Sequence, residues 1–96
     1  MRVTFANKRL SLIRTKEAHE LGLPLAVVKS CRDKINFIEN ASTELSLSNY
    51  KSLGYKKLGG SETRQIKLND QYRMHFELDN TTSPPTVLVT FIGDPH

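Results

Sequence analysis

The spacing of hydrophobic positions changes near residue 50 of the chain. Before that point, apolar residues recur every three or four positions, which is typical of helices. After it, apolar and polar residues alternate, which is typical of strands with one face on a core. The pattern therefore predicts a helical first half, preceded by one short strand, and a second half made of strands.

The start of the chain is predicted to contain a strand and a helix. Arg2 to Phe5 has the composition of a short strand, and Asn7 is a suitable N-cap for a helix from about Lys8 to Leu21. Gly22 is placed to end that helix. The apolar stripe of this segment is thin, so we expect the helix to be half exposed.

A second helix is predicted from Pro24 to about Ala41. Proline suits the first turn of a helix. The apolar residues that follow at helical spacing are Val28, Cys31, Ile35, Ile38 and Ala41. Cys31 lies within this stripe, which favours a small buried side chain over a reactive thiol. The polar segment from Ser42 to Asn49 is interpreted as a loop.

The second half is predicted to contain strands at residues 55–58, 64–69, 72–78 and 86–92. The first two of these strands are separated by a turn at Gly59, Gly60 and Ser61. The second and third are separated by a turn at Asn69-Asp70. The strand at 86–92 is apolar on both sides, so we place it inside the sheet.

These elements predict a single α+β domain over residues 1–96. The apolar helix stripe and the apolar side of the sheet are each other's available partners. We therefore expect two N-terminal helices packed on one face of a mainly antiparallel sheet of four or five strands.

Composition narrows the cellular setting. The 96 residues carry a net charge of +4, and charged residues interrupt every apolar run, so no membrane-spanning segment is predicted. The first ten residues lack the apolar core of a secretory signal. The single cysteine excludes an internal disulfide and a multi-cysteine zinc site. These features favour a protein of the cytoplasm.

The face of the sheet opposite the helices is predicted to be polar and basic. Strand parity places Gln65, Lys67, Arg73, His75 and Glu77 there. Basic residues also crowd the strands beside Gly59-Gly60, namely Lys56, Lys57, Arg64 and Lys67. His96 follows the last strand and should emerge at an edge of the same sheet.

Two interpretations of this face remain open. Many antiparallel sheets simply have one solvated side. The same residues also suit RNA cleavage by the 2′-hydroxyl, which needs a proton acceptor, a proton donor and stabilisation of the phosphorane charge. No carboxylate cluster suggests magnesium, and His19, His75 and His96 lack zinc-type spacing, so no metal or cofactor is predicted.

One stretch, RQIKLNDQYRMHFEL, is followed by a strand and an Asp-X-His ending. In this it resembles the HigB-like (killer protein) branch of the RelE/ParE toxin superfamily of type II toxin–antitoxin systems. The resemblance implies a RelE-like fold. It also implies a metal-independent endoribonuclease that cuts messenger RNA in the ribosomal A site and inhibits translation.

The same resemblance assigns roles to particular residues. Lys57 and Arg73 would steady the scissile phosphate, and His96 would exchange a proton. The residues expected to contact RNA around them are Lys56, Arg64, Lys67, Asp94 and His75. Lys56-Lys57-Leu58-Gly59 departs from the family's Leu-Lys-Gly element, so either Lys56 or Lys57 can occupy the site position.

Two further departures leave the activity open. Gly54 stands where many relatives have a histidine, and Pro95 stands where they have a tyrosine. The alternatives are a ParE-like inhibitor of DNA gyrase with the same fold, or an inactivated relative that only binds an antitoxin.

The resemblance also implies partners. These are a cognate antitoxin, expected to be a helix-turn-helix DNA-binding protein, together with the ribosome and its messenger RNA in the bacterial cytoplasm. A basic surface should attract an acidic partner segment. No long apolar stripe is left unassigned, so we expect the toxin to be monomeric outside the antitoxin complex.

Overall fold

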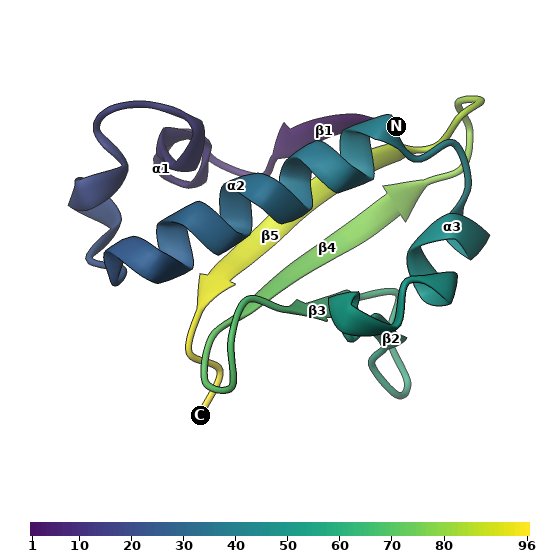
Figure 1. The fold of residues 1–96 in the computed structure, drawn as a ribbon. Coiled ribbons are helices and arrows are strands. Elements are labelled where there is room, and N and C mark those ends of the chain that lie inside the picture. The colour runs from purple at the N-terminus through teal and green to yellow at the C-terminus, as the bar shows by residue number, and fades with distance from the viewer.

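The computed structural model describes residues 1–96 as a five-stranded sheet with helices on one face (Figure 1). The strands are β1 (Arg2–Phe5), β2 (Lys56–Lys57), β3 (Arg64–Lys67), β4 (Arg73–Asp79) and β5 (Thr86–Gly93). Their order is β1-β5-β4-β3-β2, with β1 parallel to β5 and all other neighbours antiparallel. The predicted α+β class is confirmed.

Strand β5 lies inside the sheet, between β1 and β4. Val3 is paired with Val87 and Phe5 with Val89, so the first and last strands run side by side. Val87 is completely buried under the helices. The predicted interior position of this strand is confirmed.

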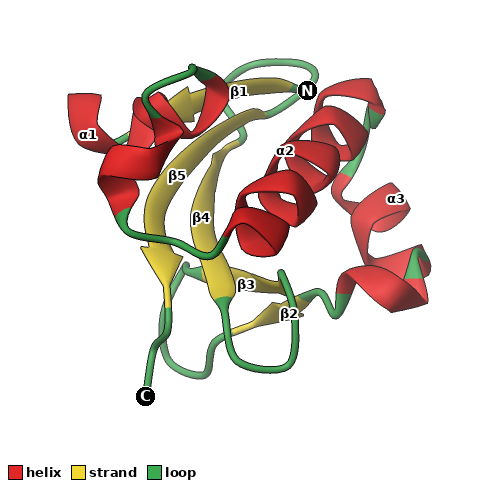
Figure 2. Cartoon of the chain, turned by 60° about the vertical axis from the view of Figure 1, so that its left-hand side comes forward, coloured by secondary structure: helices red, strands yellow, loops and turns green.

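Helix α2 (Leu25–Asn40) lies across the sheet and supplies most of the helical layer (Figures 1 and 2). Its buried residues are Val27, Val28, Cys31, Ile35 and Ile38. Pro24 is the residue just before the helix rather than its first turn. Each fully buried aliphatic side chain stabilises the fold by about 1.5–3 kcal/mol, so this face holds the two layers together. None of the helices combines the length and apolar character that crossing a membrane requires.

The core between the layers contains the alternate residues of β3 and β4 predicted to face inward. Ile66, Met74 and Phe76 have no exposed surface. The sulfur of Cys31 is 3.9 Å from that of Met74, and burial raises the pKa of the Cys31 thiol to about 12. The cysteine is therefore a core residue, as predicted.

The prediction of one continuous helix at residues 8–21 is wrong. The segment is divided into α1 (Lys8–Ser11) and two 3₁₀ turns, η1 (Leu12–Arg14) and η2 (Ala18–Leu21). Its predicted ends are correct. The Asn7 side chain accepts a hydrogen bond from the Leu10 N–H at 2.9 Å, and Gly22 ends the last turn with a φ of +70°.

The interruption of this helix has a tertiary cause. Thr15 adopts an extended conformation, with a φ of −118° and a ψ of 169°. The Arg32 guanidinium of α2 donates hydrogen bonds to the carbonyls of Ile13, at 2.7 Å, and Thr15, at 2.6 Å. Because a side chain from another helix satisfies these carbonyls, the local helix does not need to continue.

The predicted loop at residues 42–49 is also wrong. It contains α3 (Glu44–Asn49), whose N-cap Thr43 accepts a hydrogen bond from the Ser46 N–H at 3.2 Å. A 3₁₀ turn, η3 (Lys51–Leu53), follows it. Only Leu47 of α3 is buried, so no repeating apolar stripe marks this helix in the sequence.

Candidate functional site

The open face is our term for the side of the sheet that points away from α2. Cross-strand partners project to the same side of a sheet. The residues of the open face considered below are Lys56, Gln65, Lys67, Arg73, His75, Glu77 and Phe91. Six of them lie in two neighbouring rows, one of Lys56, Gln65, His75 and Phe91, and one of Lys67 and Arg73, which Gly93 completes. Glu77 is paired with Leu88 in a separate row.

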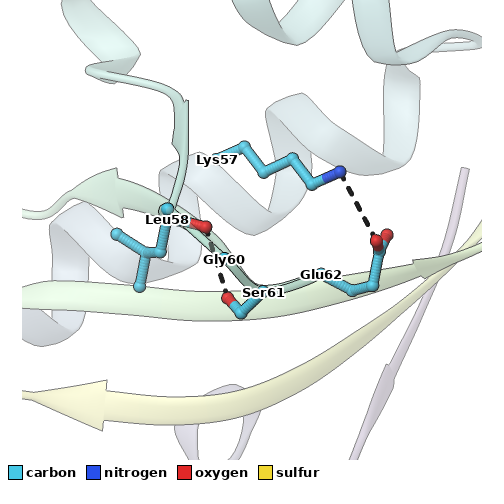
Figure 3. Close-up of a pocket in the computed structure, with 6 residues that line it drawn as sticks. Lys57, Leu58, Gly60, Ser61 and Glu62 are labelled. Atoms are coloured by element: carbon cyan, nitrogen blue, oxygen red, sulfur yellow. Dashed lines mark hydrogen bonds and ion pairs between the residues drawn. The ribbon is translucent and has the colours of Figure 1, made fainter.

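The two candidate lysines project in opposite directions. Lys56 is paired with Gln65 and therefore shares the open face, whereas Lys57 is paired with Arg64, which faces the helices. The Lys57 ammonium is 3.5 Å from a Glu62 carboxylate oxygen, beside a hollow at the β2–β3 turn (Figure 3). The structure thus places Lys56, and not the expected Lys57, on the face of Arg73.

Arg64, which was expected among the residues that contact RNA, is buried in the core layer. Only 6% of the residue is exposed. Its guanidinium contacts Glu44 at 3.2 Å and donates to the Glu62 carbonyl at 2.6 Å. Tyr55 donates a hydrogen bond to the same Glu44 carboxylate, and burial with that bond raises the pKa of the Tyr55 hydroxyl to about 12. Arg64 therefore attaches α3 to the sheet and is withdrawn from the RNA-facing set.

Arg73 is held by the turn that joins β3 and β4. One guanidinium nitrogen donates to the carbonyls of Asn69, at 2.6 Å, and Tyr72, at 3.0 Å, and another donates to that of Asp70 at 3.2 Å. No carboxylate forms an ion pair with it. The side chain is thus fixed by neutral acceptors while its positive charge remains available to an anion.

The C-terminal residues are attached to the same turn (Figure 1). Asp94 accepts a hydrogen bond from the Gln71 side-chain amide at 2.8 Å, and from the His96 backbone N–H at 2.9 Å. These bonds, with that from the His96 ring, lower the pKa of Asp94 to about 2. Since Arg73 is paired with Gly93, this connection brings Arg73, Asp94 and His96 to one end of the sheet.

Asp94 also orients the His96 ring. Its carboxylate is 2.9 Å from Nδ1 of His96, and an ionised carboxylate can only accept, so Nδ1 carries the proton. The other ring nitrogen, Nε2, then remains able to exchange a proton with a bound molecule. The His96 side chain is 73% exposed, so a large substrate can reach it.

His75 belongs to a different group of residues on the open face. Its Nε2 is 3.0 Å from the Gln65 side-chain oxygen, and its ring centroid is 5.0 Å from that of Phe91. Burial lowers the pKa of the His75 imidazole, which favours the neutral ring. No hydrogen bond joins it to Arg73 or His96.

Lys67 stands next to Arg73 on the open face, and its stem covers Gly54. A Cβ atom at position 54 would be only 2.8 Å from Cγ of Lys67, and Gly54 has a φ of +64°. Both the backbone and the lysine stem therefore require glycine here. A histidine at this position, as in many HigB-like proteins, would need a different local structure.

Three residues of this region were not singled out as site residues from the sequence. Gln71 anchors Asp94, and Gln65 and Phe91 flank His75. Gln71 lies within the NDQYR stretch, but no local pattern indicates contact with a residue 23 positions away. The structure contains no group of three or more His, Cys, Asp and Glu side chains that could hold a metal ion.

Comparison with known proteins supports the architecture. No protein-family model and no curated protein sequence matches this chain. Among solved structures, its fold is similar to that of a YoeB/ParE toxin from Agrobacterium tumefaciens, with a TM-score of 0.59 over the whole of both chains. The two sequences are 10% identical. The likeness establishes a shared fold with a toxin of the YoeB/ParE type.

Proposed function

We propose that this protein is the toxin of a type II toxin–antitoxin system, and that it cleaves messenger RNA on the ribosome without a metal ion. The observation that carries the proposal is that Arg73 is paired with Gly93, so Arg73 and the end of β5 that leads to His96 lie at the same end of the sheet. Arg73 has no acidic partner, and His96 is oriented by Asp94. The fold shared with a YoeB/ParE toxin and the HigB-like sequence motif support the same class.

In the proposed reaction, Arg73 and Lys56 bind the scissile phosphate and stabilise the charge of the phosphorane. His96 Nε2 accepts the proton of the 2′-hydroxyl as its oxygen attacks phosphorus. The bond from phosphorus to the 5′-oxygen breaks, and that oxygen takes up a proton from water, while His96 returns its own proton to solvent. The products are a 2′,3′-cyclic phosphate and a free 5′-hydroxyl.

The distribution of charge supports binding of a phosphate backbone at this end. Lys56, Lys67 and Arg73 lie on β2, β3 and the start of β4, whereas Glu77 lies further along β4. The one carboxylate that the proposed site contains, Asp94, is already hydrogen-bonded to Gln71 and His96. A phosphate chain gains affinity from each cation that it neutralises, and a carboxylate repels it. RNA should therefore lie over the first residues of β4, beside His96.

Expression in a bacterial host tests the proposal. Wild-type protein should arrest growth and generate new messenger-RNA ends in a translating extract, and Arg73→Ala and His96→Ala should do neither. Arg14→Ala is a matched control, because Arg14 forms its ion pair with Glu39 of α2, which lies on the opposite side of the sheet from the open face. Growth arrest with intact messages would sink the nuclease proposal.

Inhibition of DNA gyrase is the second candidate, because the structural neighbour is a toxin of the YoeB/ParE type and a ParE-like gyrase inhibitor would have the same fold. Supercoiling by purified gyrase separates the two activities. Inhibition by wild type and by His96→Ala alike would favour gyrase. A protein inactive in both assays would be a relative that only binds an antitoxin, an alternative that Gly54 and Pro95 support.

We also propose that an acidic segment of a cognate antitoxin covers the basic end of the open face. Lys56, Lys67 and Arg73 offer complementary charge there. An antitoxin co-purified from the native host should lose affinity as salt is raised. It should also protect Lys56 and Lys67 from amine-specific labelling.

A further inference from the structure

Phe91 is an aromatic residue on a face that is otherwise mostly polar. It lies on the interior strand β5, opposite His75, and its side chain is partly exposed instead of joining the core. The helices lie against the other face of the sheet (Figures 1 and 2), and Phe91 is not among the residues packed against the core. The ring is thus available to a flat partner arriving from solvent.

The glycine two residues further on makes room for the Phe91 ring. A Cβ atom at position 93 would be 3.1 Å from the Cζ atom of Phe91, so the ring lies over Gly93. The His75 ring is its cross-strand neighbour, with the ring centroids 5.0 Å apart and 41° between the two ring planes. The two rings together form a continuous aromatic patch across β4 and β5.

This patch has polar groups at its edge but no charge. The His75 ring is favoured in its neutral form by burial, which lowers its pKa. When the Gln65 oxygen accepts from His75 Nε2, the amide NH₂ of Gln65 remains free to donate. A flat apolar surface with an amide donor beside it suits a nucleobase, which has a π-face and hydrogen-bonding edges.

The patch lies one row from the proposed phosphate site. Gln65, His75 and Phe91 make one row, and Lys67, Arg73 and Gly93 make the next on the same face. Successive rows on one face of a sheet are two residues apart, or about 7 Å. A nucleotide whose phosphate binds Arg73 can therefore extend its base over Phe91.

We propose that Phe91 and His75 form a stacking subsite for one base of single-stranded RNA, with Gln65 contacting the edge of that base. This inference rests on the proposed ribonuclease function and specifies how its substrate is held. Stacking on an aromatic side chain tolerates any base, so the subsite contributes affinity and register more than sequence preference.

The subsite can be tested with a short RNA that contains 2-aminopurine, whose fluorescence is quenched by stacking. The His96→Ala protein is used so that the RNA stays intact. We expect quenching on binding, loss of quenching with about tenfold weaker affinity in a Phe91→Leu variant, and retention of both in Phe91→Tyr. Leu88→Ala, on the same strand and face beside Glu77, is the matched control and should behave like the parent.

Parallel assays keep the two proposals distinguishable. Circular dichroism and melting temperature establish that each variant is folded. Quenching that is absent from the parent, or equally strong in Phe91→Leu, overturns the stacking subsite even if messenger RNA is still cut. Conversely, if quenching depends on Phe91 but the wild-type protein cuts no message in a translating extract, the subsite is supported and the nuclease is overturned.

Discussion

Lys56 and Lys57 are consecutive in the chain but belong to opposite faces of the sheet. Lys56 is paired with Gln65 of the open face, and Lys57 is paired with the buried Arg64. The side-chain alternation of a strand makes this division unavoidable once the register with β3 is known. Two residues that the sequence alone left interchangeable thus provide an internal comparison.

Replacing each lysine by alanine should separate their roles. Lys56→Ala should lower the rate of messenger-RNA cleavage by about 100-fold, because it removes one cation from the developing phosphorane charge. Lys57→Ala should cut nearly as fast as wild type, because it loses only an exposed pairing with Glu62. Cleavage rates in a translating extract measure both. The reverse order of effects would place the wrong lysine in the site.

Asp94 is expected to act through His96 and not on RNA directly. Asp94→Asn removes the acceptor that keeps the proton on Nδ1, and should lower cleavage by about 10- to 100-fold without unfolding the protein. The ¹⁵N signals of the His96 ring should change their tautomer pattern in parallel. Asp70→Asn is the control, because only the backbone carbonyl of Asp70 contacts Arg73. Loss of cleavage with an unchanged His96 ring would contradict the positioning role.

The acid titration of Asp94 follows from its hydrogen bonds. Its pKa is about 2, below the ordinary value of 3.8, so the folded state prefers the ionised carboxylate. The contacts with Gln71 and His96 therefore contribute fully above about pH 4 and are lost as pH falls through about 2. In Gln71→Ala, the pKa should move toward 3.8, measured by the ¹³C shift of the Asp94 carboxyl. An unchanged titration would exclude Gln71 as the anchor.

Gly54 should tolerate substitution less well than the other glycines. Gly54→Ala combines a positive φ with a collision against the Lys67 stem, and should destabilise the protein by more than the roughly 1–2 kcal/mol of the backbone alone. Gly22→Ala, with a positive φ but open space, isolates the backbone cost, and Gly59→Ala should be nearly neutral. Urea unfolding ranks the three. Equal values for Gly54 and Gly22 would show that the Lys67 contact is unimportant.

The Arg64 cluster should matter for stability and not for RNA. Arg64→Met keeps much of the side-chain volume but removes the charge from Glu44 and Tyr55, at a cost of about 2 kcal/mol because Glu44 remains partly hydrated. Arg14→Met, which breaks an exposed pair with Glu39, should cost about 1 kcal/mol or less. Thermal unfolding measures both. A loss of RNA binding without a loss of stability in Arg64→Met would return this residue to the RNA-facing set.

The parts of the fold that local spacing encodes were predictable. Alternation in β4 places Met74 in the core and Arg73 on the open face, and helical spacing identifies the buried side of α2. The sequence also predicted that His96 emerges from the sheet where the last strand ends, because it follows that interior strand directly. In these cases the spacing of apolar residues is enough to predict which way each side chain points.

The parts that failed depend on contacts between distant residues. The break at Thr15 is stabilised by Arg32, 17 positions away, and Asp94 is anchored by Gln71 across 23 positions. The face of Lys56 depends on its register with β3, and a two-residue strand contains too little alternation to reveal it. Helix α3 has a single buried residue, Leu47, so it produces no periodic signal.

The side-by-side position of β1 and β5 has a consequence for synthesis of the protein. The Thr4 hydroxyl donates to the carbonyl of Val87, 83 residues later, so the sheet cannot close until β5 has been synthesised. Until β5 has left the ribosome, β4 has no neighbour on one side and Arg73 lacks its cross-strand partner Gly93. Such late closure makes folding slow, because most of the chain must be looped before these contacts form. For the proposed nuclease, the strand that leads to His96 is therefore the last to join the sheet, and a partly synthesised chain that lacks β5 cannot contain the complete site.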